Sequence, residues 1–203
     1  METVFQIAIL VMSVVVHEVS HGFAARALGD PTAELAGRLT LNPIKHLDPL
    51  GSFLVPLVTS FAGFTFGWAK PVPYNPYNLK PGRWSEALVA VAGPAANVGL
   101  ALVFGLGLRF EIVPAIFGEA GIAIAFSVTL INLVLAIFNL VPIPPLDGFK
   151  ILLSVLPFHL SEKLRVVLES YGLIGVLIFV FFFWQVVSPL VYFLFSLITG
   201  IAL

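Results

Sequence analysis

Long apolar stretches dominate the chain, and polar residues gather between them. The apolar runs cover residues 3–28, 50–67, 86–108, 120–141 and 172–203. A helix that crosses the hydrocarbon core of a bilayer needs about 20 predominantly apolar residues. The first, third and fourth runs satisfy that length, and the last run is long enough for a further span. The pattern therefore predicts an all-α polytopic membrane protein with about four transmembrane helices.

Glycine and proline interrupt the second run. Residues 50–67 contain Gly51, Pro56, Gly63 and Gly67. Such residues weaken a membrane helix, and irregular backbone at membrane depth is tolerated where protein or water surrounds it. Taken alone, this run is therefore either a poor span or a re-entrant segment that enters the membrane and returns.

The C-terminal part of the chain predicts further helices. Residues 158–172, FHLSEKLRVVLESYG, repeat leucine at helical spacing, which is typical of a helix lying on a membrane surface. In the final run, Ser188 and Pro189 are expected to divide a span from a short terminal helix, because proline interrupts helices. We expect a single domain over 1–203, with a core at about 3–155 and C-terminal membrane helices at 158–203.

Composition supports a membrane protein and excludes several other classes. Hydrophobic side chains make up 59% of the 203 residues and charged ones 10%, with a mean hydropathy of +1.05. These values lie far from those of soluble domains. A net charge of −1 argues against a nucleic-acid partner. The chain has no cysteine, which excludes disulfides and thiolate ligands.

Three ionisable residues lie inside the first apolar run, in VVVHEVSHGF. An ionisable group in hydrocarbon costs at least about 2.5 kcal/mol, so His17, Glu18 and His21 need a common reason. His17 and His21 are four residues apart, and on a helix their rings can converge on one metal ion. Glu18 lies beside them, as in the H-E-x-x-H motif of zinc peptidases. The alternative is a set of buried polar groups that bond to neighbouring helices.

A zinc ion needs a further ligand at a similar depth in the membrane. Among the acidic residues outside the first run, only Asp147 follows directly on a long apolar run, in FNLVPIPPLDGFKIL. The prolines end the helix and Gly148 allows a tight turn. An Asp-Gly pair after prolines can also be an ordinary surface turn. Its pairing with the two histidines favours Asp147 as a ligand.

A short alternating pattern follows the first run. In AELAGRLTLNP, residues 33–43, Arg38, Thr40 and Asn42 alternate with leucines, which is typical of a strand. Proteolysis needs an unwound substrate, and an exposed strand could bind one by β-addition. We therefore expect a small membrane-associated β element in which Arg38 and Thr40 contact substrate. A simple amphipathic hairpin on the membrane surface is the alternative.

Two segments of the chain resemble the site-2 protease family of intramembrane zinc metalloproteases. They are HEVSHGFAARALGD and, much later, NLVPIPPLDG. The resemblance covers about residues 5–155 and extends to the segments GRLTLNPIKHLDPLGS, FGWAKPVPYNP and GPAAN. The similarity is to small bacterial and archaeal members. It implies one Zn²⁺ per chain, held by His17, His21 and Asp147, with Glu18 as the general base. It also implies a substrate in the form of a transmembrane segment of another membrane protein, cut during regulated intramembrane proteolysis.

The resemblance implies roles for two asparagines as well. Asn139 in NLVPIPPLDG resembles an asparagine that binds substrate or helps to stabilise the oxyanion. Asn97 in GPAAN matches another recurrent polar position, read either as a substrate contact or as a link between helices. With 203 residues, the chain leaves no room for the PDZ or CBS domains of larger members.

Lysine and arginine predict how the chain is oriented. They cluster at residues 26–83 and 150–165, and the positive-inside rule places both clusters in the cytoplasm. The histidines and Asp147 then meet on the cytoplasmic side of a prokaryotic membrane, provided that residues 50–67 do not cross fully. We therefore expect that segment to be re-entrant.

Two other functions are compatible with metal ligands in a membrane. A divalent-metal transporter would be expected to show repeats and ligands along a path near the midplane, whereas here a single cluster lies towards one side. A non-catalytic scaffold that binds zinc for stability would have no use for Glu18, since a closed structural site needs only its ligands.

Overall fold

The computed structural model describes residues 2–48, 50–51, 69–169 and 184–202. In this part of the chain the regular elements are all helical, and no strand is present. The helices are α1 (Glu2–Ala27), α2 (Thr32–Leu35), α4 (Ser85–Arg109), α5 (Ile112–Asn139), α6 (Asp147–Val155), α7 (Phe158–Glu169) and α9 (Trp184–Thr199). The described part of the connection between α1 and α4 contains the 3-10 helices η1 (Pro43–His46) and η3 (Pro76–Asn78).

Among the described residues, three helices are long and apolar enough to cross a membrane, which confirms the predicted first, third and fourth runs as candidate spans of an integral membrane protein. They are Val4–Ala27, Ser85–Arg109 and Ile112–Asn139. Helices satisfy their own backbone hydrogen bonds, so apolar sequences adopt them in lipid. In α5, Gly118 has non-helical angles and marks a kink close to the predicted start at residue 120.

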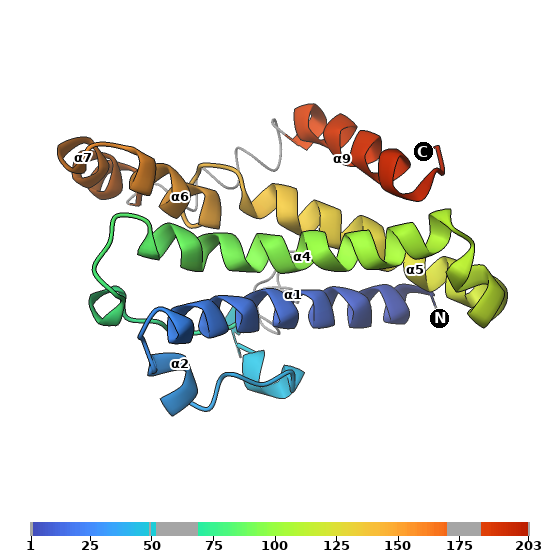
Figure 1. Ribbon diagram of the computed structural model, residues 1–203, viewed down its shortest axis with the longest axis horizontal. Coiled ribbons are helices and arrows are strands. Elements are labelled where there is room, and N and C mark those ends of the chain that lie inside the picture. The colour runs from blue at the N-terminus through green and yellow to red at the C-terminus, as the bar shows by residue number, and fades with distance from the viewer. Residues whose placement is uncertain (1, 49, 52–68, 170–183, 203) are drawn as a thin grey trace.

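The spans α1, α4 and α5 pack against one another, with α4 antiparallel to α1 (Figure 1). Leu28 follows α1 and Lys80 precedes α4, and the Lys80 backbone N–H donates to the Leu28 carbonyl over 2.7 Å. The connection between the two spans therefore begins and ends at the same end of the bundle. The predicted re-entrant segment within it falls almost entirely on residues 52–68, outside the described residues.

Helix α9 packs against α4 and α5. Ala101, Leu133, Val191 and Phe195 form a buried apolar cluster between these three helices. Gly105 permits this contact, because a Cβ there would lie 2.5 Å from Ile198 Cγ2. The further span predicted in the last apolar run, residues 172–203, falls largely on residues 170–183, outside the described residues.

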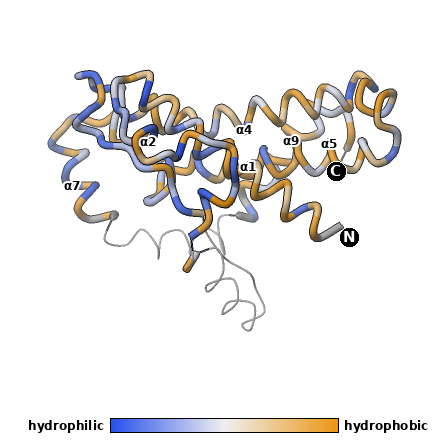
Figure 2. Tube along the Cα trace, turned by 90° about the horizontal axis from the view of Figure 1, so that it is seen from below, coloured by the Kyte–Doolittle hydropathy of each residue, from blue (hydrophilic) through white to orange (hydrophobic). Residues whose placement is uncertain are grey.

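Hydrophobic residues run along the long helices, whereas many hydrophilic ones gather at the end of the molecule that carries α2 and α7 (Figure 2). Arg83, just before α4, donates to the carbonyls of Ser154 and Leu156 at the C-terminal end of α6, over 2.8 Å and 3.2 Å. These contacts hold α6 at the end of the bundle where α1 finishes and α4 begins.

Two local predictions were wrong. The alternating residues 38–42 form no strand; Asn42 caps η1, and the Thr40 carbonyl accepts from His46 Nε2, so side chains and a 3-10 turn satisfy this backbone instead.

Ser188 and Pro189 do not divide the terminal run, because α9 continues through both. The Ser188 hydroxyl lies 3.5 Å from the Gln185 carbonyl, the group that loses its helical partner to proline.

Candidate metal centre

Helix α1 places His17 and His21 on one face, one turn apart. Their rings meet edge to face at 4.6 Å between centroids, and their Nε2 atoms are 3.0 Å apart. Both residues are buried, with 5% and 8% of their surface exposed. The predicted convergence of the two imidazoles is therefore present in the folded chain.

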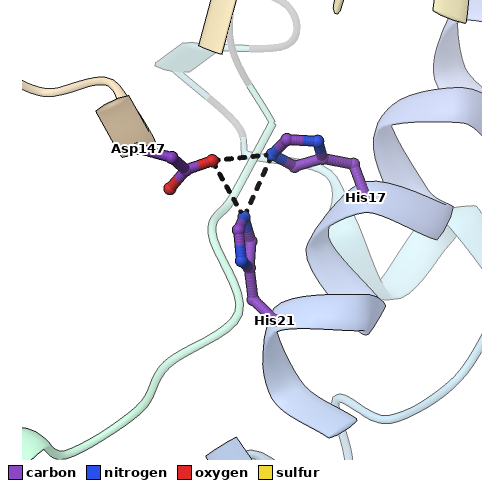
Figure 3. A group of neighbouring side chains, drawn as sticks. All are labelled: His17, His21 and Asp147. Atoms are coloured by element: carbon purple, nitrogen blue, oxygen red, sulfur yellow. Dashed lines mark hydrogen bonds and ion pairs between the residues drawn. The ribbon is translucent and has the colours of Figure 1, made fainter. Parts of the chain in front are cut away.

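Asp147, the first residue of α6, completes the group. Its Oδ2 lies 3.1 Å from Nε2 of His17 and 3.1 Å from Nε2 of His21 (Figure 3). The three ligand atoms all lie within 4.8 Å of one another. Gly148 makes this placement possible, because a Cβ there would lie 2.2 Å from the Leu140 carbonyl oxygen. The turn after α5 thus folds back tightly enough to direct Asp147 at α1.

Helix α4 leaves space for the group at Gly93. A Cβ at this position would lie 2.5 Å from His21 Nε2 and 2.6 Å from His17 Nε2. A larger side chain at position 93 would therefore collide with the Nε2 atoms of both imidazoles. Two imidazoles and a carboxylate are a suitable set of protein ligands for a catalytic zinc site, which has three protein ligands and keeps a fourth position for water or substrate.

The outer nitrogens of both imidazoles have fixed partners. His21 Nδ1 donates to the Val89 carbonyl over 2.7 Å, and His17 Nδ1 donates to Asn97 Oδ1 over 2.5 Å. Both acceptors lie on α4. With a metal ion bound, these contacts would keep the protons on Nδ1 and leave the Nε2 lone pairs for the ion, as in metal sites where outer hydrogen bonds orient the histidines.

Asn97 belongs to a buried chain of polar groups between the spans. Its Nδ2 donates to Asn132 Oδ1 over 2.7 Å, and Asn132 Nδ2 donates to Ser13 Oγ over 2.9 Å. Asn97 and Asn132 are fully buried. The link between helices expected for Asn97 is therefore present, and its surroundings leave no exposed surface for a substrate contact.

Charge and hydrogen bonding keep Asp147 in the form that binds a metal. Burial by itself raises the pKa of a carboxyl group, but hydrogen bonds from His17 and His21 outweigh it, and the pKa of Asp147 is lowered. Lys150 Nζ, 3.7 Å from Asp147 Oδ1, adds a positive charge. Asp147 therefore stays a carboxylate.

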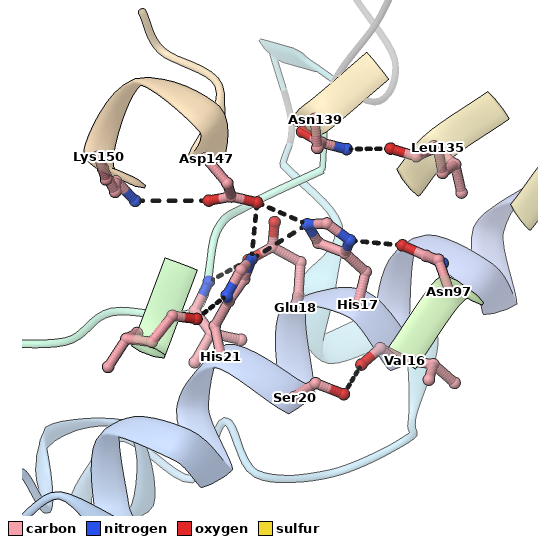
Figure 4. A network of polar contacts seen from close by, with 12 residues as sticks. Val16, His17, Glu18, Ser20, His21, Asn97, Leu135, Asn139, Asp147 and Lys150 are labelled. Carbon is pink, nitrogen blue, oxygen red and sulfur yellow. Dashed lines mark hydrogen bonds and ion pairs between the residues drawn. The ribbon is translucent and has the colours of Figure 1, made fainter. Parts of the chain in front are cut away.

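Glu18 lies on α1 next to His17 and is not one of the three grouped ligands. Its Oε2 accepts a hydrogen bond from the backbone N–H of Val72 over 2.8 Å. Figure 4 shows the Glu18 side chain directed to the side of α1 on which His17, His21 and Asp147 meet. This position is compatible with a group that acts beside the ligands.

The other predicted site residues are Asn139, Arg38 and Thr40, and their hydrogen bonds described below go to groups other than the three ligands. Asn139 is half-buried at the end of α5 and donates to the Leu135 carbonyl of its own helix over 2.9 Å (Figure 4). Arg38 is buried and donates to the carbonyls of Lys70 and Pro71. Thr40 Oγ1 accepts from the Asn42 backbone N–H over 3.2 Å.

The sequence interpretation missed four residues that shape the site. They are Ser13, Val72, Gly93 and Asn132. Asn132 could have been identified from the sequence, because an amide inside an apolar run needs a hydrogen-bond partner. The backbone contact of Val72 and the space at Gly93 depend on which segments face α1, which no local pattern reports.

Comparison with known proteins agrees with the geometry. The model of peptidase family M50 matches residues 5–127 and 115–183. YwhC of Bacillus subtilis, named as a zinc metalloprotease, is 41% identical over 178 residues, which cover 83% of this chain and 76% of YwhC. Rip2 of Mycolicibacterium smegmatis, also named as a zinc metalloprotease, is 38% identical over 141 residues, which cover 68% of this chain and 52% of Rip2.

A second Rip2, from Mycobacterium tuberculosis, is 32% identical over 151 residues, and the match covers 56% of its length. The chain thus spans about half the length of these mycobacterial relatives. No solved structure gave a significant match. The family match nevertheless extends over most of the chain, which therefore belongs to peptidase family M50, the family of the site-2 proteases that its motifs resemble.

Proposed function

We propose that this chain is a zinc metalloprotease that hydrolyses peptide bonds in or near transmembrane segments of other membrane proteins. One observation carries the proposal: the ligand atoms of His17, His21 and Asp147 lie within 4.8 Å of one another, beside Glu18 and among apolar spans. The relatives named as zinc metalloproteases support zinc as the metal and hydrolysis as the reaction.

In this proposal His17 Nε2, His21 Nε2 and Asp147 Oδ2 hold one zinc ion. Zinc supplies a Lewis acid, which lowers the pKa of water and polarises the carbonyl to be cleaved. Glu18 accepts a proton from the attacking water as the new C–O bond forms, and delivers it to the departing amine nitrogen as the C–N bond breaks. Its Oε2 is engaged by Val72, so Oε1 is the proton acceptor.

Residues outside the ligand group would bind or position the substrate. Asn139 and Thr40 are half-buried, and we assign them to substrate contact. Arg38 and Asn97 are buried and occupied by their own hydrogen bonds, so we assign them to positioning. The substrate must be locally unwound, because helical amides are already hydrogen-bonded.

The site would lie towards the cytoplasmic side. Most lysines and arginines fall in residues 26–83 and 150–165, near the end of the bundle that carries α2, α6 and α7. The connection starts at Leu28 and returns at Lys80, so both of its ends lie at this end of the bundle. Cleavage at this depth would serve regulated intramembrane proteolysis.

Replacement of Glu18 by glutamine tests the mechanism. The variant keeps the size of the side chain and removes the proton acceptor, so cleavage should fall by about 10²- to 10⁴-fold. Zinc content should stay at one ion per chain, whereas His17→Ala should lose metal and activity together. The assay follows cleavage of a glycine-containing single-span peptide in detergent, with and without a chelator. Unchanged cleavage by zinc-loaded Glu18→Gln would contradict Glu18 as the base.

A further inference from the structure

The sequence Pro71-Val72-Pro73 has a single backbone N–H. Proline has none, so within these three residues only Val72 can donate. That one N–H lies 2.8 Å from Oε2 of Glu18. The segment at 69–75, here called the strap, therefore directs its available donor at the proposed catalytic base.

The strap is fixed on both sides of Val72. On one side, Arg38 Nη2 donates to the Lys70 carbonyl over 2.7 Å and to the Pro71 carbonyl over 3.3 Å. On the other, the Asn75 backbone N–H donates to the buried carboxylate of Asp30 over 2.7 Å. Anchors on both sides restrict where the Val72 N–H can lie.

The side chain of Val72 is also held against α1. It is 5% exposed, and a Cβ on Gly22 would lie 2.9 Å from its Cγ1. Gly22 is one residue beyond His21, so the strap approaches the helix of the H-E-x-x-H motif at the turn that carries the metal ligands. The close contact fixes the distance between the strap and Glu18.

We infer that the backbone amide of Val72 is a positioning group, which holds the Glu18 carboxylate by Oε2 so that Oε1 can accept the proton of the attacking water. The inference rests on the proposed protease function. A glutamate has three rotatable side-chain bonds, and a base must be aligned with the atom that it deprotonates. A fixed donor on one oxygen supplies that alignment, and Arg38 contributes by fixing the strap.

Hydrogen exchange tests the contact without any cleavage assay. In full-length protein labelled with ¹⁵N-valine, the amide signal of Val72 is assigned as the one that is absent from the spectrum of Val72→Ala. Glu18→Ala should speed exchange of this amide by about tenfold or more, because the carboxylate acceptor is lost. Ser20→Ala is the matched control, since Ser20 lies on α1 and its hydroxyl donates to Val16 of the same helix. An unchanged Val72 exchange rate in Glu18→Ala would overturn the inference.

Kinetics test the positioning role. Val72→Pro removes the N–H, and its flanking prolines already suit an extended backbone. Val72→Ala keeps the N–H and trims the side chain, which makes it the matched control. Relative to Val72→Ala, Val72→Pro should lower kcat for the single-span peptide by about 10- to 100-fold, with KM within about threefold and zinc content unchanged.

The outcomes separate this inference from the proposed function. Wild type that cleaves the peptide, with Val72→Pro and Val72→Ala equally active, would contradict the positioning role and leave the protease assignment standing. Wild type that binds zinc but cleaves no membrane peptide would contradict the protease assignment. If Val72→Pro does not fold, the exchange rate of Val72 in Glu18→Ala decides whether the contact exists.

Discussion

Asn97 on α4 and His17 on α1 are joined by a 2.5 Å contact between Asn97 Oδ1 and His17 Nδ1. Asn97 is in turn bonded to Asn132 on α5. One imidazole is thus oriented by groups from all three central spans. The arrangement explains why an amide is buried among apolar helices, because it keeps Nε2 of His17 directed at the ligand group.

Asn97→Leu should therefore weaken zinc binding. The substitution removes the acceptor for His17 Nδ1, and loss of such an outer partner costs about 10- to 100-fold in metal affinity. Competition with a chelator measures the change. Thr129→Val is the control, because Thr129 is equally buried but donates to the Ala125 carbonyl of its own helix. Equal losses in the two variants would contradict a specific role for Asn97.

Gly93→Ala should prevent metal binding with little effect on helix formation. The new Cβ would lie 2.5–2.6 Å from both imidazole Nε2 atoms, in the space that an ion needs. Gly99→Ala on the same helix is the control, since a Cβ there meets no atom within 4 Å. Alanine favours helices over glycine by about 1 kcal/mol, so this control should be as stable as wild type or more stable. Full zinc occupancy in Gly93→Ala would contradict the assignment of the site.

Asp30 should stabilise the fold in a pH-dependent manner. Burial by itself raises the pKa of its carboxyl group, but hydrogen bonds from Thr32, Asn78 and Asn75 outweigh burial and lower it. Because the folded pKa is below the unfolded one, near 3.8, ionised Asp30 stabilises the fold above that pH. The contribution is lost as the pH falls towards the folded pKa.

Asp30→Asn is accordingly expected to lower the free energy of unfolding by about 2 kcal/mol at pH 7. The difference from wild type should narrow below about pH 4, as thermal unfolding in detergent can measure. Glu34→Gln is the control, because Glu34 pairs with Arg26 at the surface, where an ion pair is worth about 0–1 kcal/mol. If the free energies of unfolding of Asp30→Asn and wild type differ by the same amount at every pH, the carboxylate of Asp30 is not the cause of the difference.

Cysteine labelling can test the topology, since the chain has no native cysteine. Lys80 precedes α4 and Lys163 lies on α7, and both should label from the cytoplasmic side when replaced by cysteine. The contacts of Arg83 with Ser154 and Leu156 hold these regions at one end of the bundle. Glu111→Cys, between α4 and α5, should label from the opposite side. Labelling of the two lysine positions from different sides would contradict the proposed orientation.

The sequence by itself determined the features that depend on local spacing. An apolar run of sufficient length forms a membrane helix, and two histidines four residues apart on it share a face, so the spans and the pairing of His17 with His21 could be predicted. Asp147 could be selected because few carboxylates follow an apolar run. The family resemblance gave the same ligands, and the family match agrees with it.

Only the tertiary structure decided which groups meet across the bundle. Alternation in residues 38–42 indicated a strand, but a strand needs a partner, and here 3-10 and side-chain contacts satisfy the backbone. The space at Gly93 and the Val72 N–H at Glu18 arise from segments about 54 to 76 residues away from the motif. A periodic pattern specifies which face of a helix is polar, whereas packing specifies what that face contacts.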